Sequence, residues 1–393
     1  MNNDPAMIVD AIKSVLRDVE LPVSLHEPSF VGREWSLLKD CLDSGYVSSV
    51  GEYVDRFEQQ LAQYLGAKHV VAVVNGTAAL HISLLLAGVK PGDEVVVPSL
   101  TFVATANAVS YCSAIPHFVD SEQSTLGLDP AKLGQYFADI LHQDNGQWLN
   151  RHTGRRVAAI VPMHTFGHPV DMDALNEVAG QYGLPMIEDA AESLGSRYKG
   201  RMSATLSSLA AVSFNGNKIL TTGGGGAIVT NDKALAERAK HLTTTAKLPH
   251  RWQISHDEVG FNYRMPNLNA ALGCAQLERL AGFVEQKRSL AEMYKKTFSC
   301  IAGVEWFQEP EFARSNYWLN ALLLDDANLA RRNEALEALN NDGIMARPAW
   351  TLMHTLPMYQ ACPRMDLSVA ENLEQRLICI PSSPFLVRGD SSA

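Results

Sequence analysis

The sequence lacks three features that would each have pointed to another class of protein. No run of about 20 apolar residues, the length that crosses a bilayer, occurs in the chain, so we expect no membrane-spanning helix. The 6 cysteines form no C-x-x-C pair and no metal-ligand spacing, which indicates isolated, mostly buried thiols in a reducing compartment and no metal site. Basic residues are outnumbered, 33 against 43 acidic ones, and a net charge of −10 does not suit a nucleic-acid binder.

The N-terminus also lacks the basic-then-apolar order of a signal peptide. Charged residues instead alternate with apolar ones, at Asp4, Asp10, Lys13 and Arg17, a pattern that predicts an amphipathic helix. We therefore expect a cytoplasmic protein. At the other end, Pro384 to Ala393, the sequence predicts no closing helix.

The chain has ample apolar material for a large core, with 46% hydrophobic residues in 393. Apolar segments alternate with helical patterns over the first half, at 70–74, 94–98, 116–119, 157–162 and 184–188. Such alternation predicts an α/β fold, a mostly parallel sheet wrapped by helices. We expect a large α/β domain over residues 1–249, including the N-terminal helical segment, and a smaller C-terminal α+β domain over 250–393. The segment 141–155 is interpreted as an exposed surface loop.

Lys218 is the most informative residue. It lies between the apolar run Leu209 to Val212 and the glycine run Gly223 to Gly226. A lysine amine forms a Schiff base with an aldehyde only when it is unprotonated, so such lysines lie in shielded pockets. The alternative is an ordinary surface lysine, because Lys is seldom buried.

Two further motifs place polar groups at strand ends. An apolar run, Val70 to Val74, leads through Gly76 and Thr77 into a helix, and N–H groups at a helix N-terminus attract an anion such as phosphate. Helix capping by Asn75 or Thr77 explains the same residues. The second motif ends a short strand in Asp189, where the carboxyl end of an α/β sheet faces the ligand crevice. Helix capping is again the alternative.

A loop with polar and aromatic residues, Val259 to Pro266, then runs into an apolar helix from Leu268 to about Leu280. Together these segments resemble the DegT/DnrJ/EryC1/StrS family of aminotransferases, which use pyridoxal 5′-phosphate (PLP) and act on nucleotide-linked keto-sugars. The resemblance covers nearly the whole chain and includes Val47 to Gly51 and Arg347 to Trp350. It implies fold type I, the aspartate aminotransferase-like architecture.

The resemblance assigns roles at the cofactor ring. Lys218 matches the lysine that forms a Schiff base with PLP and later moves the substrate proton, so it is the predicted catalytic residue. Asp189 matches the carboxylate that keeps the pyridine nitrogen protonated, which makes the ring a better electron sink. Glu192 matches the position near the ring hydroxyl.

The remaining cofactor contacts follow in the same way. Ser213, together with Gly76 and Thr77, matches the residues that hold the phosphate. Phe102 matches the aromatic residue that stacks on the ring. Asn262 matches a residue that reaches the phosphate from the neighbouring subunit, which implies a homodimer with shared active sites.

Within the family, the stretches Val47 to Gly51, His164 to Pro169 and Lys247 to Trp252 resemble the branch that aminates C4 of UDP-linked 4-keto-6-deoxy-N-acetylhexosamines. This implies a ping-pong reaction with L-glutamate as the amino donor and a role in polysaccharide biosynthesis, such as that of an O-antigen. Lys247, Arg251 and Arg347 are candidates for binding the sugar-nucleotide diphosphate, because paired cations suit phosphate oxygens. A plain surface charge is the favoured alternative for each of them.

Several alternatives stay open. The sugar nucleotide can be a 3-keto or a GDP- or dTDP-linked one, and a non-catalytic PLP-binding regulatory protein on the same fold is a second possibility. The glycine run also suggests a dinucleotide-binding enzyme, but Ile228 stands where G-x-G-x-x-G needs glycine, and the run precedes a strand. Gly224 departs from the family, where many relatives carry glutamate, which weakens inferences about contacts of that loop.

Overall fold

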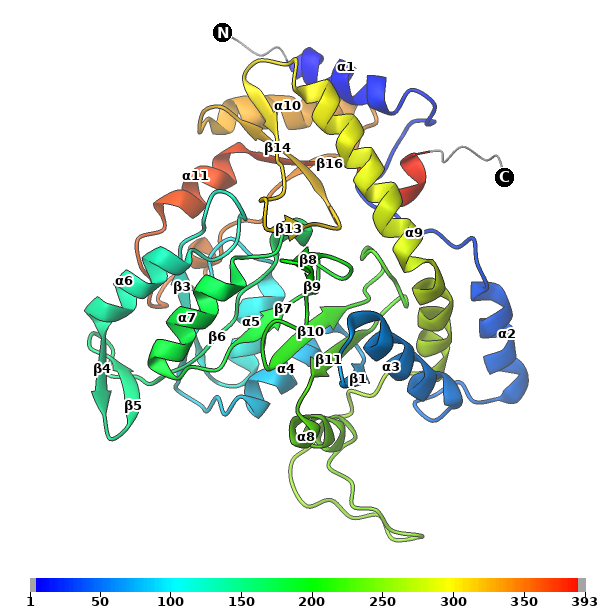
Figure 1. The fold of residues 1–393 in the computed structure, drawn as a ribbon, viewed down its shortest axis with the longest axis vertical. Helices are drawn as coiled ribbons and strands as arrows, with labels where there is room; N and C mark the ends of the chain where they lie inside the picture. Colours follow the sequence, from blue (N-terminus) through cyan, green and yellow to red (C-terminus); the bar gives the residue numbers. More distant parts are fainter. Residues whose placement is uncertain (1–4, 388–393) are drawn as a thin grey trace.

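A computed structural model describes residues 5–387 of the chain (Figure 1). The helices, in chain order, are α1 (Pro5–Val15), α2 (Glu34–Ser44), α3 (Glu52–Leu65), α4 (Gly76–Leu86), α5 (Val103–Tyr111), α6 (Pro130–Ile140), α7 (Met172–Tyr182), α8 (Lys233–Thr243), α9 (Asn267–Phe298), α10 (Leu329–Asn341) and α11 (Ser368–Arg376). The strands of the first half and centre are β1 (His69–Val73), β2 (Glu94–Pro98), β3 (Ile115–Val119), β4 (Leu141–Asp144), β5 (Gln147–Asn150), β6 (Val157–Ile160), β7 (Ile187–Asp189), β8 (Arg197–Tyr198), β9 (Arg201–Met202), β10 (Leu209–Ser213) and β11 (Gly226–Thr230). The C-terminal strands are β12 (Val304–Trp306), β13 (Ala313–Arg314), β14 (Asn320–Leu324), β15 (Arg347–Pro348) and β16 (Leu377–Ile380).

The central sheet is mostly parallel, as predicted. Its strands form two groups, ordered β1-β11-β10-β7 and β3-β2-β6. Two isolated parallel bridges join the groups, one between Ile160 and Met186 and one between Met163 and Asp189. Within these groups only β11 runs against its neighbours. The carboxyl ends of β1, β2, β7 and β10 therefore lie at the same edge of the sheet, which is where an α/β fold binds ligands.

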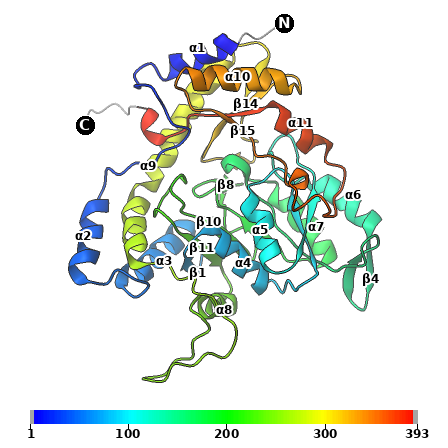
Figure 2. The same ribbon diagram turned by 180° about the vertical axis from the view of Figure 1, so that it is seen from behind.

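Helices cover both faces of this sheet, so its strands are apolar on both sides. In β2, Val95 and Val97 pack into the core under α4 and α5, whereas Val96 between them packs into the core under α6 and α7. Figures 1 and 2 show these two helix pairs on opposite faces. A continuous apolar strand of this kind is what the sequence pattern of an α/β protein predicts.

The C-terminal part forms a second sheet, ordered β12-β14-β16-β15. The N-terminal helix α1 confirms the predicted amphipathic helix and buries its apolar face, including Ile8 and Ile12, in one core with residues of α9, α10 and this sheet. Asp4, the first charge of the predicted helix, lies outside the described residues. The domain boundary at 249/250 stays a prediction.

Two local predictions needed revision. The segment 141–155 contains a β-hairpin of β4 and β5, and its Asn150 side chain donates a hydrogen bond to buried Glu94 (2.9 Å), so it is more than a surface loop. The helix predicted to end near Leu280 continues to Phe298. At the chain end, the last described element is a 3-10 turn at Pro384–Leu386, and the predicted absence of a helix beyond it falls on residues 388–393, outside the described part.

Among residues 5–387, no helix combines the length and the apolar character that crossing a bilayer requires. The six cysteines are free thiols, and four of them, Cys41, Cys112, Cys274 and Cys379, are buried. This agrees with the prediction of isolated, mostly buried thiols.

Candidate active site

A cavity of about 330 Å³ opens at the carboxyl edge of the central sheet. It brings together eight of the predicted site residues: Gly76, Thr77, Phe102, Asp189, Glu192, Ser213, Lys218 and Arg347. Most of them directly follow a strand end, because parallel strands deliver the residues after them to one edge. The predicted cofactor and catalytic residues thus share one cavity, apart from Asn262.

Lys218 enters the cavity from the turn between β10 and β11. Its Nζ lies 3.1 Å from Oε1 of Glu192, and its side chain is 12% exposed. The same Nζ lies 3.9 Å from the ring centroid of Trp318, a cation–π distance. The amine is therefore shielded and held by one carboxylate and one aromatic face.

Asp189 ends β7 and is 3% exposed. Its Oδ2 accepts a hydrogen bond from the hydroxyl of Thr105 (2.8 Å), and its Oδ1 accepts one from the Ala191 N–H (3.2 Å). Burial raises the pKa of Asp189, while these two hydrogen bonds and the Lys218 charge oppose the rise. Asp189 forms no ion pair with any residue of 5–387, and a buried carboxylate in this state suits a protonated ring nitrogen.

Glu192 lies in the same cavity on the turn that follows Asp189. Its Oε2 accepts a hydrogen bond from the Phe166 N–H (2.9 Å), and its Oε1 accepts one from Lys218. Burial raises the pKa of Glu192 to about 7, against the opposing effects of the Lys218 charge and the Phe166 N–H. This carboxyl group therefore changes its protonation state near neutral pH.

The N-terminus of α4 faces the cavity next to the end of β10. Asn75 caps the helix, because its side chain accepts a hydrogen bond from the Ala78 N–H (2.8 Å). This cap uses the N–H of Ala78 and leaves the N–H groups of Gly76 and Thr77 at the helix start. A Cβ at Gly76 would come within 2.8 Å of the Ser213 Cβ, so glycine lets the helix start approach β10. This end of the cavity suits a phosphate.

These features fit PLP. The α4 N-terminus with Ser213 would hold its phosphate, Asp189 would face its ring nitrogen, and Lys218 would bond its aldehyde carbon. Phe102, which is 49% exposed and lines the cavity, lies 6.5 Å from the Trp350 ring (centroid distance). Which aromatic ring stacks on the cofactor stays a prediction.

Three predicted residues lie outside this cavity. Lys247, Arg251 and Asn262 are exposed and belong to the segment 244–262, which extends from the end of α8, away from the sheet (Figure 1). Asn262 forms an antiparallel bridge with Thr244 at the base of this segment. Of the three predicted diphosphate ligands, only Arg347 lines the cavity of its own chain.

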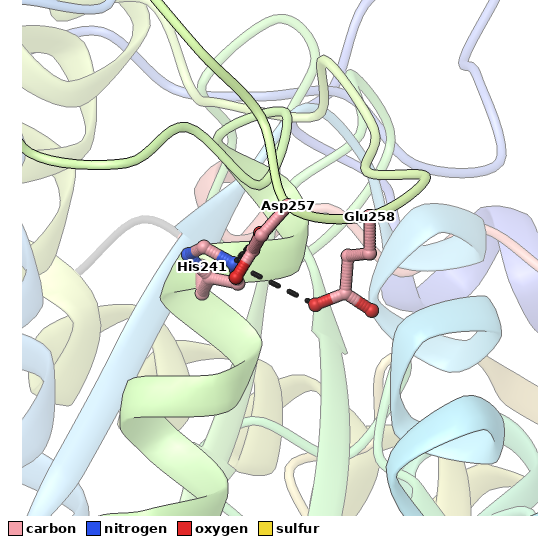
Figure 3. Close-up of side chains that lie close together, drawn as sticks. All are labelled: His241, Asp257 and Glu258. Atoms are coloured by element: carbon pink, nitrogen blue, oxygen red, sulfur yellow. Dashed lines mark hydrogen bonds and ion pairs between the residues drawn. The ribbon is translucent and has the colours of Figure 1, made fainter.

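A polar cluster fastens the base of the same segment to α8 (Figure 3). His241 Nε2 lies 2.8 Å from Asp257 Oδ1, and Arg238 Nη2 donates to Glu258 Oε2 (2.6 Å). The His241, Asp257 and Glu258 ligand atoms lie within 4.8 Å of one another, a spacing that a metal could use. These exposed or half-exposed groups already form ion pairs with one another, so we interpret the cluster as a structural contact between the segment and α8.

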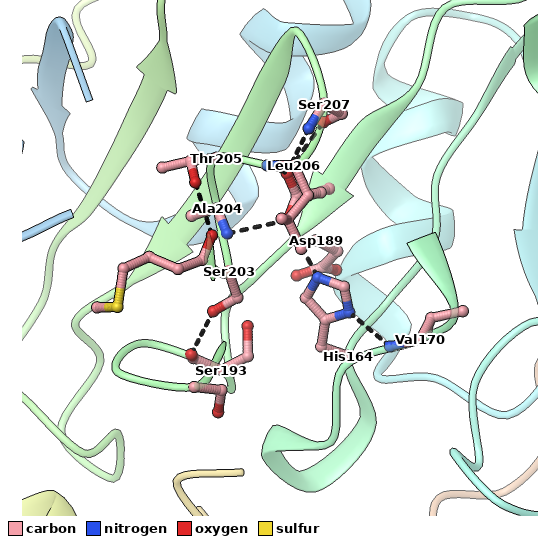
Figure 4. A network of polar contacts seen from close by, with 12 residues as sticks. His164, Val170, Asp189, Ser193, Ser203, Ala204, Thr205, Leu206 and Ser207 are labelled. Carbon is pink, nitrogen blue, oxygen red and sulfur yellow. Dashed lines mark hydrogen bonds and ion pairs between the residues drawn. The ribbon is translucent and has the colours of Figure 1, made fainter. Parts of the chain in front are cut away.

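A buried network supports the strand end from the other face of β7 (Figure 4). His164 Nδ1 accepts a hydrogen bond from the Val170 N–H (3.2 Å), so its Nε2–H donates to Glu188 (3.1 Å). Glu188 also accepts the N–H groups of Ala204 and Leu206. These bonds fix β7 and thereby the position of Asp189.

The sequence reasoning missed several residues of the site. Trp318 and Trp350 line the cavity from the C-terminal part of the chain, and Asn217 precedes Lys218. Thr105, which contacts Asp189, lies one helical turn after Phe102. Helical periodicity from Phe102 could have found Thr105, whereas no local signal marked Trp318.

Comparison with known proteins places this site in context. The model of the DegT/DnrJ/EryC1/StrS aminotransferase family matches residues 29–392. GDP-perosamine synthase of Escherichia coli O157:H7 is 37% identical over 93% of this chain and 94% of its own length. GDP-perosamine synthase of Caulobacter vibrioides is 37% identical over 94% of this chain and 96% of its own length.

A solved structure agrees with these matches. A DegT DnrJ EryC1 StrS aminotransferase from Brucella abortus superposes with a TM-score of 0.82 and 28% identity, covering 91% of this chain and 92% of that one. The predicted fold type I is confirmed.

Proposed function

The chain belongs to the DegT/DnrJ/EryC1/StrS aminotransferase family, and we propose that it transfers the amino group of L-glutamate to C4 of a nucleotide-linked 4-keto-6-deoxy sugar. It is a PLP-dependent enzyme of the nucleotide-sugar aminotransferase class. The observation that carries the proposal is the joint placement of Lys218, Asp189 and the α4 N-terminus around one cavity.

When bound, PLP supplies an electron sink that stabilises negative charge on the carbon that loses a proton, and it carries the amino group between the two substrates. Asp189 would keep the ring nitrogen protonated from its buried position at the end of β7. Lys218, once its amine is free, would take the proton from the donor carbon and deliver it on the cofactor side. General acid–base transfer of this kind contributes about 10²–10⁴-fold to the rate.

The surroundings of Lys218 suit that role. Glu192 holds the Nζ at 3.1 Å and changes its protonation state near neutral pH, so it can accompany the changes in charge at the lysine. Phe102, Trp318 and Trp350 line the cavity with aromatic rings, which makes this part of its wall apolar. Arg347 is exposed at the same cavity and would bind an anionic group of a substrate.

For the nucleotide, we infer a GDP-linked sugar. The sequence motifs resembled the UDP-N-acetylhexosamine branch, but two relatives of 37% identity are named GDP-perosamine synthases, which supports the GDP-linked alternative. The test is a panel of 4-keto-6-deoxy sugars linked to GDP, UDP (as the N-acetylhexosamine) or dTDP, each supplied with L-glutamate, with release of 2-oxoglutarate as the readout. The GDP sugar should give the highest kcat/KM; a preference for the UDP sugar would overturn the nucleotide assignment.

We also propose that the enzyme is a homodimer with shared active sites. Asn262 is exposed on its own chain and does not line its own cavity, which supports a role in the site of a partner subunit. Asn262→Asp keeps the side-chain size but places a carboxylate where a phosphate ligand is expected, so cofactor affinity should fall.

Mixing this variant with Lys218→Ala tests the sharing. If subunits reassort at random, half of the dimers are mixed and one of their two sites is intact, so about a quarter of the native activity should return. A mixture that stays inactive although the subunits exchange would contradict shared sites.

A further inference from the structure

Trp318 contacts the Lys218 amine, which in the proposed reaction is alternately bonded to the cofactor and free. The Lys218 Nζ lies over its ring at 3.9 Å from the centroid, and Trp318 itself is 2% exposed. Tryptophan is the best aromatic partner for a cation, and the attraction grows when the contact is shielded from water. Among the described residues, the groups in contact with this Nζ are therefore a carboxylate, Glu192, and an aromatic face.

The ring of Trp318 is held in place by its own contacts. Its indole N–H donates a hydrogen bond to the carbonyl of Asn217 (2.8 Å), the residue before Lys218. Its backbone N–H donates to Oδ1 of Asn316 (2.8 Å). The first bond ties the ring to the backbone beside Lys218, and the second holds the Trp318 backbone.

A second lysine, Lys287 on α9, bonds the backbone of the same tryptophan. Lys287 is 0% exposed, and its amine donates hydrogen bonds to the carbonyls of Trp318 (3.0 Å) and Ser382. It forms no ion pair with any described residue, and burial lowers its pKa well below the ordinary value. Both hydrogen bonds go to backbone carbonyls, so the Lys287 amine holds the chain at Trp318 and Ser382.

We propose that Trp318 is a positioning residue for Lys218: its ring holds the Lys218 amine as an ammonium whenever the lysine is not bonded to the cofactor, and Lys287 fixes the backbone of Trp318. The proposal rests on the proposed aminotransferase function. To bond the cofactor again, the ammonium must lose a proton before the amine condenses with the aldehyde carbon and water leaves. Trp318 thus opposes premature bonding and keeps the amine within reach.

Other titratable groups act on the same amine and must be separated from this effect. Glu192 contacts it, Asp189 lies in the same cavity, and His26 lies near enough for its pKa to respond to the Lys218 charge. Burial, followed by the charges of Lys287 and Lys218, lowers the pKa of His26 well below its usual value, so His26 stays neutral. Both carboxyl groups, Glu192 and Asp189, are still present in the Trp318 variants, so their effects on the amine are common to all the proteins compared.

The test follows PLP uptake by the apoenzyme as a function of pH, by the visible absorbance of the lysine-bound cofactor, without any sugar. Loss of a shielded cation–π contact should weaken protonation of Lys218 about five- to thirtyfold. In Trp318→Leu, the pH at which the rate of PLP uptake is half-maximal, called the midpoint here, should therefore be lower than in the native protein. Trp318→Phe keeps a ring and should give a smaller shift, and Lys287→Met should shift the midpoint in the same direction.

Trp148→Leu is the matched control, because it removes a tryptophan of β5 that packs against Tyr182 and does not line the cavity. Its midpoint should match that of the native protein. The inference is overturned if Trp318→Leu and Trp318→Phe both titrate like the native protein, or if Trp148→Leu shifts equally. A native protein that takes up no PLP would instead overturn the proposed function.

Discussion

Thr105 offers a sharp test of how the site controls Asp189. Both residues are buried, and the Thr105 hydroxyl donates a hydrogen bond to Oδ2 of Asp189 at 2.8 Å. The hydroxyl has one proton, so Thr101, at 2.8 Å from the Thr105 oxygen, must donate to it in turn. Thr105→Val keeps the side-chain shape and removes the donor to the carboxylate.

The size of the effect follows from this geometry. A hydrogen bond to a charged group contributes about 1.5–3 kcal/mol. The bond favours the ionised carboxylate, so its loss should shift the ionisation equilibrium of Asp189 toward the protonated form about ten- to a hundredfold. Burial already raises the pKa of Asp189, and the substitution acts in the same direction.

The consequence is measurable as cofactor affinity against pH. Only ionised Asp189 can pair with a protonated ring nitrogen, so the pH below which PLP affinity falls should move upward in Thr105→Val. Thr105→Ser retains the hydroxyl and should behave like the native protein. If Thr105→Val showed the native pH profile, the assigned role of Asp189 at the ring nitrogen would be refuted.

Two further predictions concern catalysis and stability. Lys218→Ala should lower turnover by at least about 10²–10⁴-fold and abolish the visible absorbance of the lysine-bound cofactor; near-native turnover without added amines would contradict the catalytic role. His168 is fully buried between the rings of Phe307 and Tyr317, and burial lowers its pKa to about 3. The unfolded histidine binds a proton below about pH 6.5, whereas the folded one does so only near pH 3, so the free energy of unfolding should fall between these pH values. His168→Leu should remove this part of the acid sensitivity, as measured by urea unfolding curves at several pH values. An unchanged pH dependence in the variant would contradict the assignment.

Much of the site could be predicted because its residues follow strand ends. Gly76, Asp189 and Ser213 occur where an apolar run stops, and the parallel sheet brings such positions to one edge. Charge alone could not place Lys247 and Arg251, because a charged side chain does not determine the direction in which an exposed segment extends. Its path away from the cavity depends on the bridges and ion pairs at its base.

The missed parts depend on contacts between distant segments. Trp318 meets Lys218 only because the segment before β14 lies against the turn after β10, and the local sequence around Trp318 carries no sign of that contact. The helix α9 was predicted too short because it leaves one core, with Phe283, and enters another, with Leu290. The mostly parallel sheet itself was predictable, since strands such as β2 are apolar on both faces.

The central claim is that Lys218 and its cavity make this chain a PLP-dependent aminotransferase. The most direct measurement is the visible spectrum of the PLP-loaded protein before and after addition of L-glutamate. The absorbance of the lysine-bound cofactor should disappear with L-glutamate and return with 2-oxoglutarate. A protein that stays colourless with added PLP, or a coloured one that L-glutamate leaves unchanged, would contradict the account.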